Sequence, residues 1–319
     1  MISTASTIQP PQSYSIHLIT FDLDDTLWHT SSSIKAANVA CQSYVNATLP
    51  NTIDLTVYKV MKRLYSENPS AYYDSDIRVD EGFKREPVLL TKLRKDALLA
   101  LHSSSNAKGD AGAFADEAFN VWRDARHFAI SDSLAFGSLP ALQTLRSKGY
   151  MLGGVTNGNS EPDSVKGLEG AFDFCVQAEG VGIGKPHPLI YEVSLAKARE
   201  LRSGLPTTNE GGWWVHVGDD LIKDCVASNI MGARTILTTE YRGRGWDAEG
   251  THVVSGKGGG GGVSGQALAG GGGGGEKTGG DAEGEAEHSR AAWEVALVGY
   301  LNALLVGCRR PGLFGGKDD

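Results

Sequence analysis

Two aspartates directly after a short apolar run are the residues best placed for chemistry. Residues 16–21 are rich in apolar and β-branched side chains, which is typical of a short buried strand. Asp22 and Asp24 follow two positions apart, so in extended backbone both side chains point to the same side. Two like charges this close need a cation, and Mg²⁺ prefers oxygen ligands. The spacing predicts a magnesium site, unless the aspartates only cap a following helix.

Polar side chains of complementary type follow other strand-like runs. They are Thr156 and Asn157 after 150–155, Lys185 in the loop 180–188, and Asp219, Asp220 and Asp224 after 213–217. Because ligands of open α/β sheets bind beyond the carboxyl ends of strands, we expect these side chains at one edge of a sheet. A carboxylate can attack phosphorus, a second carboxyl can protonate the leaving oxygen, and a hydroxyl and an ammonium can hold phosphate oxygens. The set therefore suits hydrolysis of a phosphate monoester.

From residue 136 onward, strand-like and helix-like segments alternate. Expected strands lie at 150–155, 172–176, 213–217 and 233–237, and expected helices at 139–148, 189–202 and up to about 228. This alternation predicts an α/β fold with a doubly wound parallel sheet, Rossmann-like, covered by helices.

The sequence between the first two expected strands has helical patterns and no convincing strand pair. The helical patterns lie at 34–47, 55–66, 88–102 and 111–128. Four helices inserted at this point predict a separate cap over residues 34–132, which could close over the acidic crevice and exclude water.

The other segments complete the expected domain organisation. Residues 16–33 and 133–254 are assigned to the catalytic core, and residues 1–15 to a disordered leader. The Gly-rich stretch 255–290 is assigned to a flexible insertion, because its composition has little apolar surface to bury. Residues 291–310 carry apolar side chains at helical spacing, which predicts a terminal helix packed on the core.

Composition narrows the expected partners. The 319 residues carry a formal net charge of −8, which argues against nucleic acid or an anionic membrane, since both attract clustered Lys and Arg. We expect a small phosphorylated metabolite as ligand and a monomer or homodimer. The four cysteines are far apart in sequence, which favours free thiols in a reducing compartment. An intracellular, cytoplasmic location is the simplest expectation, with an organelle left open.

Four motifs resemble those of the haloacid dehalogenase-like phosphatase superfamily. They are DLDDT at 22–26, VTNGN at 155–159, GKPHP at 184–188 and VGDDLIKD at 217–224. The resemblance implies that Asp22 is the nucleophile and a Mg²⁺ ligand, and that Asp24 is the general acid and base and a backbone-carbonyl ligand. Asp219 would be a further metal ligand.

The same resemblance assigns the remaining motif residues. Thr156 and Asn157 would donate to the phosphate, and Lys185 would hold its charge. Asp224, with Asp220 beside it, would steady the metal or Lys185 from behind.

A narrower likeness points to a substrate. The segments TNGNSEP at 156–162, FDF at 172–174 and HVGDD at 216–220 resemble a subfamily of flavin mononucleotide phosphatases, which also dephosphorylate the ribitylamino-uracil phosphate precursor of riboflavin. Three alternatives stay open. The chain could act on another small sugar phosphate or phosphoglycolate, act as a haloacid dehalogenase, or be a non-catalytic binding or regulatory protein with the same fold.

Aromatic and histidine residues near the motifs have two interpretations each. Trp28 lies where the leaving group should enter, so its ring could stack on a flat substrate, or it could simply pack. Tyr72, Tyr73 and Arg78 of the cap are similar substrate-binding candidates. His187 and His216 have proline and apolar neighbours, which favours structural histidines over metal ligands.

Overall fold

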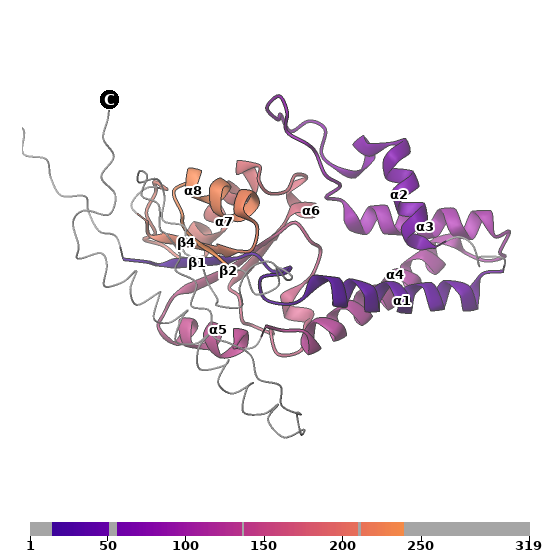
Figure 1. The fold of residues 1–319 in the computed structure, drawn as a ribbon, viewed down its shortest axis with the longest axis horizontal. Coiled ribbons are helices and arrows are strands. Elements are labelled where there is room, and N and C mark those ends of the chain that lie inside the picture. The colour runs from indigo at the N-terminus through magenta and orange to yellow at the C-terminus, as the bar shows by residue number, and fades with distance from the viewer. Residues whose placement is uncertain (1–14, 51–55, 136, 210–211, 239–319) are drawn as a thin grey trace, which may run out of the picture.

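The computed structural model describes residues 15–50, 56–135, 137–209 and 212–238 (Figure 1). The expected leader up to residue 14, the Gly-rich stretch 255–290 and the terminal helix 291–310 lie outside the described residues. No helix in the described ranges is both long and apolar enough to cross a membrane.

A five-stranded parallel sheet with the order β3-β2-β1-β4-β5 forms the core. Its strands are β1 (Leu18–Phe21), β2 (Met151–Thr156), β3 (Phe174–Gln177), β4 (Trp214–Gly218) and β5 (Arg234–Leu237). The central strand β1 pairs with both neighbours, and Phe21 lies opposite Gly154 of β2 and Val217 of β4. The carboxyl ends of β1, β2 and β4 are therefore adjacent, and so are the residues that follow them.

Helices cover both faces of the sheet (Figure 1). Helix α5 (Ser138–Ser147) packs Leu142 and Leu145 against one face, and α7 (Pro188–Leu201) and α8 (Ala227–Ile230) cover the other. This arrangement confirms the predicted α/β class with a doubly wound parallel sheet. The short helix α6 (Ala178–Val181) was not predicted, because four residues carry no helical periodicity.

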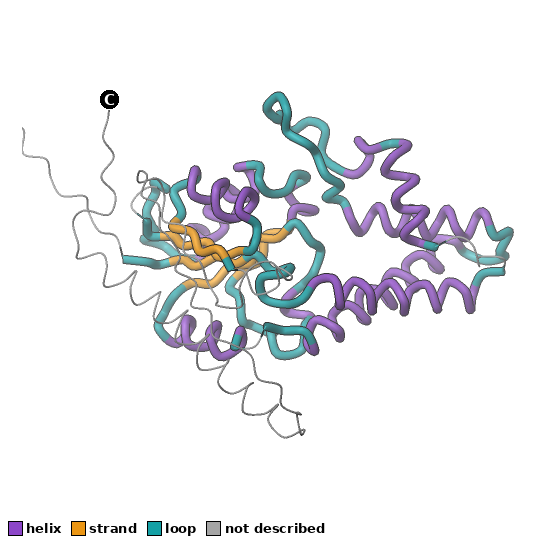
Figure 2. The backbone as a smooth tube through the Cα atoms, viewed as in Figure 1, coloured by secondary structure: helices purple, strands orange, loops and turns teal. Residues whose placement is uncertain are grey.

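Four helices between β1 and β2 form a second unit, here called the cap. They are α1 (Thr30–Thr48), α2 (Val57–Glu67), α3 (Leu90–Ser104) and α4 (Ala111–Asp132). The cap has its own apolar core, which includes Leu98, Leu101 and Trp122. Loops join the cap to the edge of the sheet (Figure 2), and the N–H of Asp74 donates to the carbonyl of Gly182 at 2.9 Å. The cap thus rests against the edge where the strands end.

The bounds of two cap helices differ from the expected ones for local reasons. Helix α1 begins at Thr30 rather than at 34, because the ring of His29 caps it by accepting the N–H of Ser32. Helix α4 runs to Asp132 rather than to 128, since Ile130 is fully buried in the core beside it. Caps and tertiary packing set these ends, and neither follows from periodicity alone.

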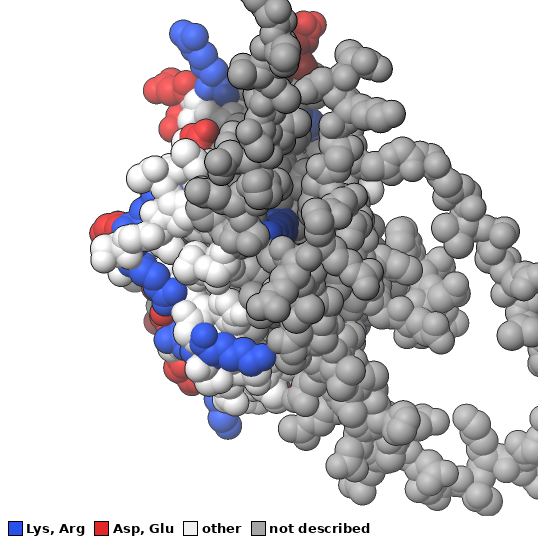
Figure 3. Space-filling view, turned by 90° about the vertical axis from the view of Figure 1, so that its left-hand side faces the viewer, with Lys and Arg blue, Asp and Glu red and all other residues white. Residues whose placement is uncertain are grey.

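Charged side chains of both signs share the face shown in Figure 3. Among the described residues of this view, Lys and Arg are interspersed with Asp and Glu. This part of the surface therefore presents no single-sign patch.

Candidate active site

Asp22 and Lys185 form a buried ion pair at the end of β1. Asp22 is 6% exposed, and its backbone N–H continues the sheet by donating to the carbonyl of Val217. Lys185 Nζ lies 2.5 Å from Asp22 Oδ1 and 2.7 Å from Asp224 Oδ1. Burial raises the pKa of Asp22, Lys185 opposes this shift, and the Asp224 carboxylate adds to it. A further cation here would favour ionised Asp22, the form that can act as a nucleophile.

Two further carboxylates, those of Asp219 and Asp224, converge with Asp22 at this pair. Asp22, Asp219 and Asp224 can each offer one oxygen, and these oxygens lie within 4.8 Å of one another. Carboxylate oxygens are the ligands of hard divalent cations, and one lysine cannot neutralise three acids, so the donor set fits Mg²⁺. The set includes Asp224, which was expected only behind the metal. The side chain of Asp24 is not part of it.

Asp224 has a central place in this cluster. Its Oδ1 accepts from Lys185 and lies 3.3 Å from His216 Nε2, while its Oδ2 accepts the N–H of Asp220 at 2.9 Å. Burial raises the pKa of Asp224, but Lys185 and His216 outweigh it and hold that pKa well below its usual range. The carboxylate is therefore ionised. Gly218 makes room for it, because a Cβ at this position would overlap the Asp224 side chain.

Asp220 and His216 hold this carboxylate from two sides. Asp220 Oδ1 accepts two backbone N–H groups of the π-helical segment Leu221–Val226, at 2.9 and 2.8 Å, and so caps the segment that carries Asp224. His216 is fully buried and lies 2.8 Å from Thr20 Oγ1. Burial lowers the pKa of His216, which favours the neutral ring. These contacts support the structural interpretation of His216.

Thr156 is the last residue of β2 and Asn157 follows it, and their side chains have different hydrogen-bond partners. Thr156 Oγ1 accepts the N–H of Gly158 at 2.9 Å, so the hydroxyl keeps its own proton for another acceptor. Asn157 Oδ1 accepts the N–H of Lys185 at 2.7 Å, and its Nδ2 donates to the Lys185 carbonyl at 2.9 Å. The expectation that Asn157 donates to the phosphate stays a prediction. Its amide is engaged at both ends and positions Lys185.

Asp24 faces the cap rather than the carboxylate cluster. Its Oδ1 accepts hydrogen bonds from Trp28 Nε1 at 2.9 Å, Thr30 Oγ1 at 3.1 Å and Arg126 Nη2 at 2.9 Å. The loop after β2 passes against its other oxygen, because a Cβ on Gly158 would overlap Asp24 Oδ2. The two aspartates of the first motif thus have separate surroundings.

Trp28 does not present its ring to a substrate. The side chain is fully buried within the apolar core around β1, and its indole N–H is bonded to Asp24. The stacking interpretation is therefore wrong, and the packing interpretation holds. Trp28 instead positions Asp24.

Arg126 is a site residue that carries no distinguishing signal in the sequence. It lies within the amphipathic helix α4, where its neighbours look like those of an exposed arginine, yet it is only 3% exposed. Its Nη1 donates to Asn159 Oδ1 at 2.7 Å, and Asn159 Nδ2 donates to Thr91 Oγ1 at 3.1 Å. Asn159 could have been noticed as part of the VTNGN motif. Together these residues join α3 and α4 to the loop after β2.

A small cavity of about 50 Å³ adjoins Lys185 and Asn157. Its other lining residues are Tyr73, Phe83, Lys84, Arg85, Glu86 and Val88 of the cap and Ile183, Gly184, Pro186 and Lys223 of the core. Of the two tyrosines considered as substrate contacts, Tyr73 borders this cavity and Tyr72 is buried. The cavity marks the route to Lys185 from the cap side.

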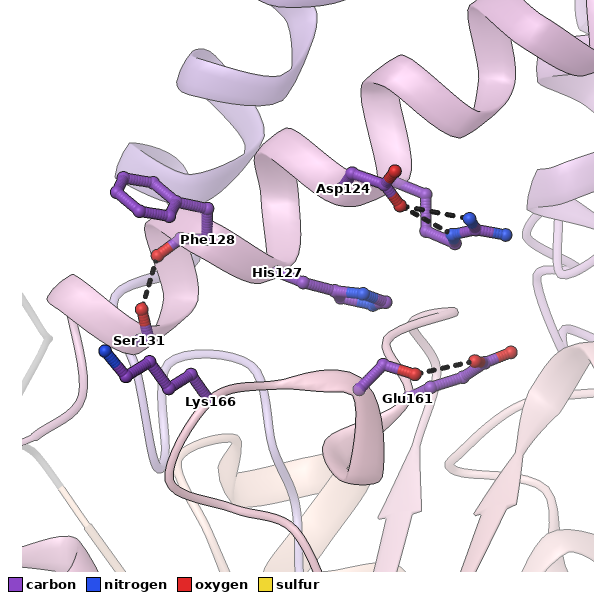
Figure 4. A pocket seen from close by; sticks show the side chains of 8 residues that line it. Asp124, His127, Phe128, Ser131, Glu161 and Lys166 are labelled. Carbon is purple, nitrogen blue, oxygen red and sulfur yellow. Dashed lines mark hydrogen bonds and ion pairs between the residues drawn. The ribbon is translucent and has the colours of Figure 1, made fainter.

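A second pocket, of about 510 Å³, lies between α4 and the segment 161–166. His127 projects from α4 into this space above the loop that carries Glu161 (Figure 4). The lining mixes Arg123 and Lys166 with Asp124 and Glu161 and includes no residue of the carboxylate cluster. It is separate from the carboxylate cluster.

Comparison with known proteins identifies the family. The sequence model of the haloacid dehalogenase-like hydrolases matches residues 16–225, a range that holds all four motifs and the cap. The chain belongs to this family. It is an enzyme family, so the predicted superfamily and the prediction of an enzyme are confirmed.

Two relatives of this hydrolase show how far the likeness extends. The glyceraldehyde 3-phosphate phosphatase of Methanothermobacter thermautotrophicus is 29% identical over 239 residues, which are 73% of this chain and 88% of the relative. The crystal structure of 2-haloacid dehalogenase from Pseudomonas syringae pv. Tomato DC3000 superposes with a TM-score of 0.56 at 29% identity, over 73% of this chain and 90% of that one. Neither is a flavin mononucleotide phosphatase.

Proposed function

We propose that this hydrolase cleaves phosphomonoesters with Mg²⁺, through an aspartyl phosphate formed on Asp22. The observation that carries the proposal is the convergence of the Asp22, Asp219 and Asp224 carboxylates, two of which share the Lys185 ammonium. Held by Asp22, Asp219 and Asp224, Mg²⁺ would neutralise charge on the phosphate and keep Asp22 ionised. This combination of nucleophile, cation and metal ligands suits phosphoryl transfer.

The proposed reaction has two steps. A carboxylate oxygen of Asp22 attacks phosphorus as the bond to the alcohol breaks, and Asp24 gives its proton to the departing oxygen. Asp24 then takes a proton from water as that water attacks the aspartyl phosphate, which releases inorganic phosphate and regenerates both side chains. The Thr156 hydroxyl donates a hydrogen bond to a phosphate oxygen, and the Lys185 ammonium balances the phosphate charge in both steps.

For the substrate we propose a small phosphorylated metabolite. The curated relative is named for glyceraldehyde 3-phosphate, which is a small ester. Flavin mononucleotide and the ribitylamino-uracil phosphate remain the larger alternatives. Trp28, the residue expected to stack on a flat ring, is fully buried, which favours the small class.

Haloacid dehalogenation is the second candidate, because the similar solved structure bears that name. Displacement of a halide needs a carboxylate nucleophile but neither a metal nor a second proton-transferring carboxyl. The acidic cluster and the separate placement of Asp24 favour phosphoester hydrolysis.

One substrate panel separates these candidates. Purified protein would be given glyceraldehyde 3-phosphate, phosphoglycolate, flavin mononucleotide and 2-chloropropionate, with Mg²⁺ or with EDTA, while phosphate and halide release are measured. We expect phosphate release from the small esters that EDTA abolishes, and none from Asp22→Asn, whose fold is checked by circular dichroism. Halide release in EDTA would establish a dehalogenase. Absence of turnover on a broad ester panel would leave a binding protein.

A further inference from the structure

Arg94 on α3 is a buried cation without an acidic partner. It is 7% exposed, and no carboxylate of the described residues forms an ion pair or hydrogen bond with it. Its Nε makes no hydrogen bond, and its guanidinium lies over the ring of Trp122, 3.6 Å from the centroid. Burying a charge without an acidic partner is unfavourable, and the contact with the Trp122 ring offsets only part of that cost.

A second buried arginine lies beside the same ring. The guanidinium carbon of Arg126 is 5.4 Å from the Trp122 centroid, and its Nε also lacks a partner. Burial, and then repulsion from Arg126, lowers the pKa of Arg94 to about 9. The nearby Glu179 carboxylate accepts from Thr91 instead. Asp24 is thus the one carboxylate paired with these two cations among the described residues.

The two arginines lie on the leaving-group side of the proposed reaction. Arg126 contacts Asp24 at 2.9 Å, and Asp24 is the group that protonates the departing alcohol. Arg126 also binds Asn159, three residues after Thr156. A substituent on the alcohol that extended from Asp24 towards the cap would meet Arg126 and Arg94 beside Trp122.

We propose that Arg94 and Arg126 bind a second anionic group on the alcohol part of the substrate. The preferred substrates are then phosphomonoesters whose alcohol carries a carboxylate or a second phosphate. This inference rests on the proposed function and narrows its substrate class. Guanidinium groups bind both kinds of anion through paired N–H donors, and the Arg94 guanidinium has no carboxylate partner among the described residues.

A series of esters of similar size tests the charge preference. The series is 2-phosphoglycolate, 2-hydroxyethyl phosphate, O-phosphoethanolamine and the bisphosphate of ethylene glycol, assayed with Mg²⁺ for kcat/KM. We expect one of the two anionic esters to exceed the neutral ester at least about tenfold, with the cationic ester lowest. Which anionic ester is better distinguishes a carboxylate from a phosphate as the bound group.

Variants assign this preference to Arg94. Arg94→Met should lower the ratio of kcat/KM for the better anionic ester over the neutral ester by about tenfold, mainly through KM. Arg94→Lys, which keeps the charge but not the planar fork, should fall between. Lys95→Met is the matched control, because it removes a charge from the next position of α3, where the ammonium is exposed and pairs with Asp116. It should keep the ratio.

Binding and stability measurements separate the two proposals. Calorimetry with Asp22→Asn should detect 2-phosphoglycolate or the bisphosphate, and Arg94→Met in that background should weaken binding at least about tenfold. Arg94→Met should not lower the Tm of the free protein, whereas a purely structural arginine would do so. Equal hydrolysis of anionic and neutral esters would overturn the inference and leave the phosphatase. Arg94-dependent binding without any hydrolysis would overturn the phosphatase and leave the anion site.

Discussion

Asp22 and Asp24 are two residues apart and have different partners. Asp22 is bound by Lys185 inside the core, and Asp24 is bound by Trp28, Thr30 and Arg126 at the base of the cap. Because their surroundings differ, one carboxyl can serve as nucleophile while the other transfers protons. Equal spacing in extended backbone does not require an equal environment.

Asp24→Asn tests this division. The amide oxygen can still accept from the Trp28 indole, so we expect the variant to fold, but it can no longer transfer a proton. We expect kcat to fall by about 10²- to 10⁴-fold. Asp25→Asn is the matched control, because Asp25 uses its side-chain oxygen only to accept the N–H of Thr30. Steady-state kinetics on both variants decides, and an unimpaired Asp24→Asn enzyme would contradict the assigned role.

Asp224 predicts a pH-dependent contribution to stability. Its pKa is lowered in the folded protein, so its stabilisation is fully present above the unfolded value of about 3.9 and declines as pH falls towards the folded value. Asp224→Asn should therefore lower the free energy of unfolding by about 3 kcal/mol at pH 7, and by less at pH 3. Urea unfolding at both pH values measures this. Asp116→Asn, from an exposed ion pair, should change little at either pH.

At the scale of elements, the carboxyl end of β2 and the loop after it position several side chains of the site. Thr156 turns its hydroxyl under the control of Gly158, Asn157 fixes Lys185, and Asn159 reaches the cap helices. Three side chains of the site thus depend on the backbone path of one short segment. Small shifts of this backbone would misplace groups that belong to both the core and the cap.

Gly158→Ala should disable catalysis while leaving the fold. The added Cβ would overlap Asp24 Oδ2, so either the loop or the Asp24 carboxyl must move. We expect kcat/KM to fall about 100-fold or more. Gly180→Ala is the control, since no atom lies within 4 Å of a Cβ built there. Equal activity of the two variants would show that the close approach has no catalytic consequence.

At the scale of the whole molecule, Mg²⁺ should stabilise the enzyme. Burial raises the pKa of Asp22, so at pH 7 an ionised Asp22 disfavours the fold unless a further cation compensates. Saturating Mg²⁺, at about 100 times its Kd, should add about 2.7 kcal/mol to the free energy of unfolding. Thermal unfolding with Mg²⁺ or EDTA measures this gain, which Asp219→Asn should largely remove. An unchanged Tm in wild type would contradict the metal site.

Much of this architecture follows from local sequence patterns. The strands and the polar residues at their carboxyl ends can be predicted, because an apolar run that stops on Asp, Thr or Asn is typical of the carboxyl edge of a parallel sheet. Arg94 and Arg126 are not readable, because which face of a cap helix meets Asp24 depends on how the cap packs on the core. The sequence also could not decide whether Trp28 packs or stacks, because that depends on how the residues around it fold.

The central position of β1 has a consequence for motion. Backbone hydrogen bonds to β2 on one side and to β4 on the other hold the strand that leads into Asp22. The cap contacts the core through side chains such as Arg126 and through the backbone bond from Asp74 to Gly182 described above. Amide hydrogens of β1 should therefore exchange with deuterium only on global unfolding, while those near the cap contacts exchange through smaller openings. The enzyme would then open and close around a nucleophile that stays still.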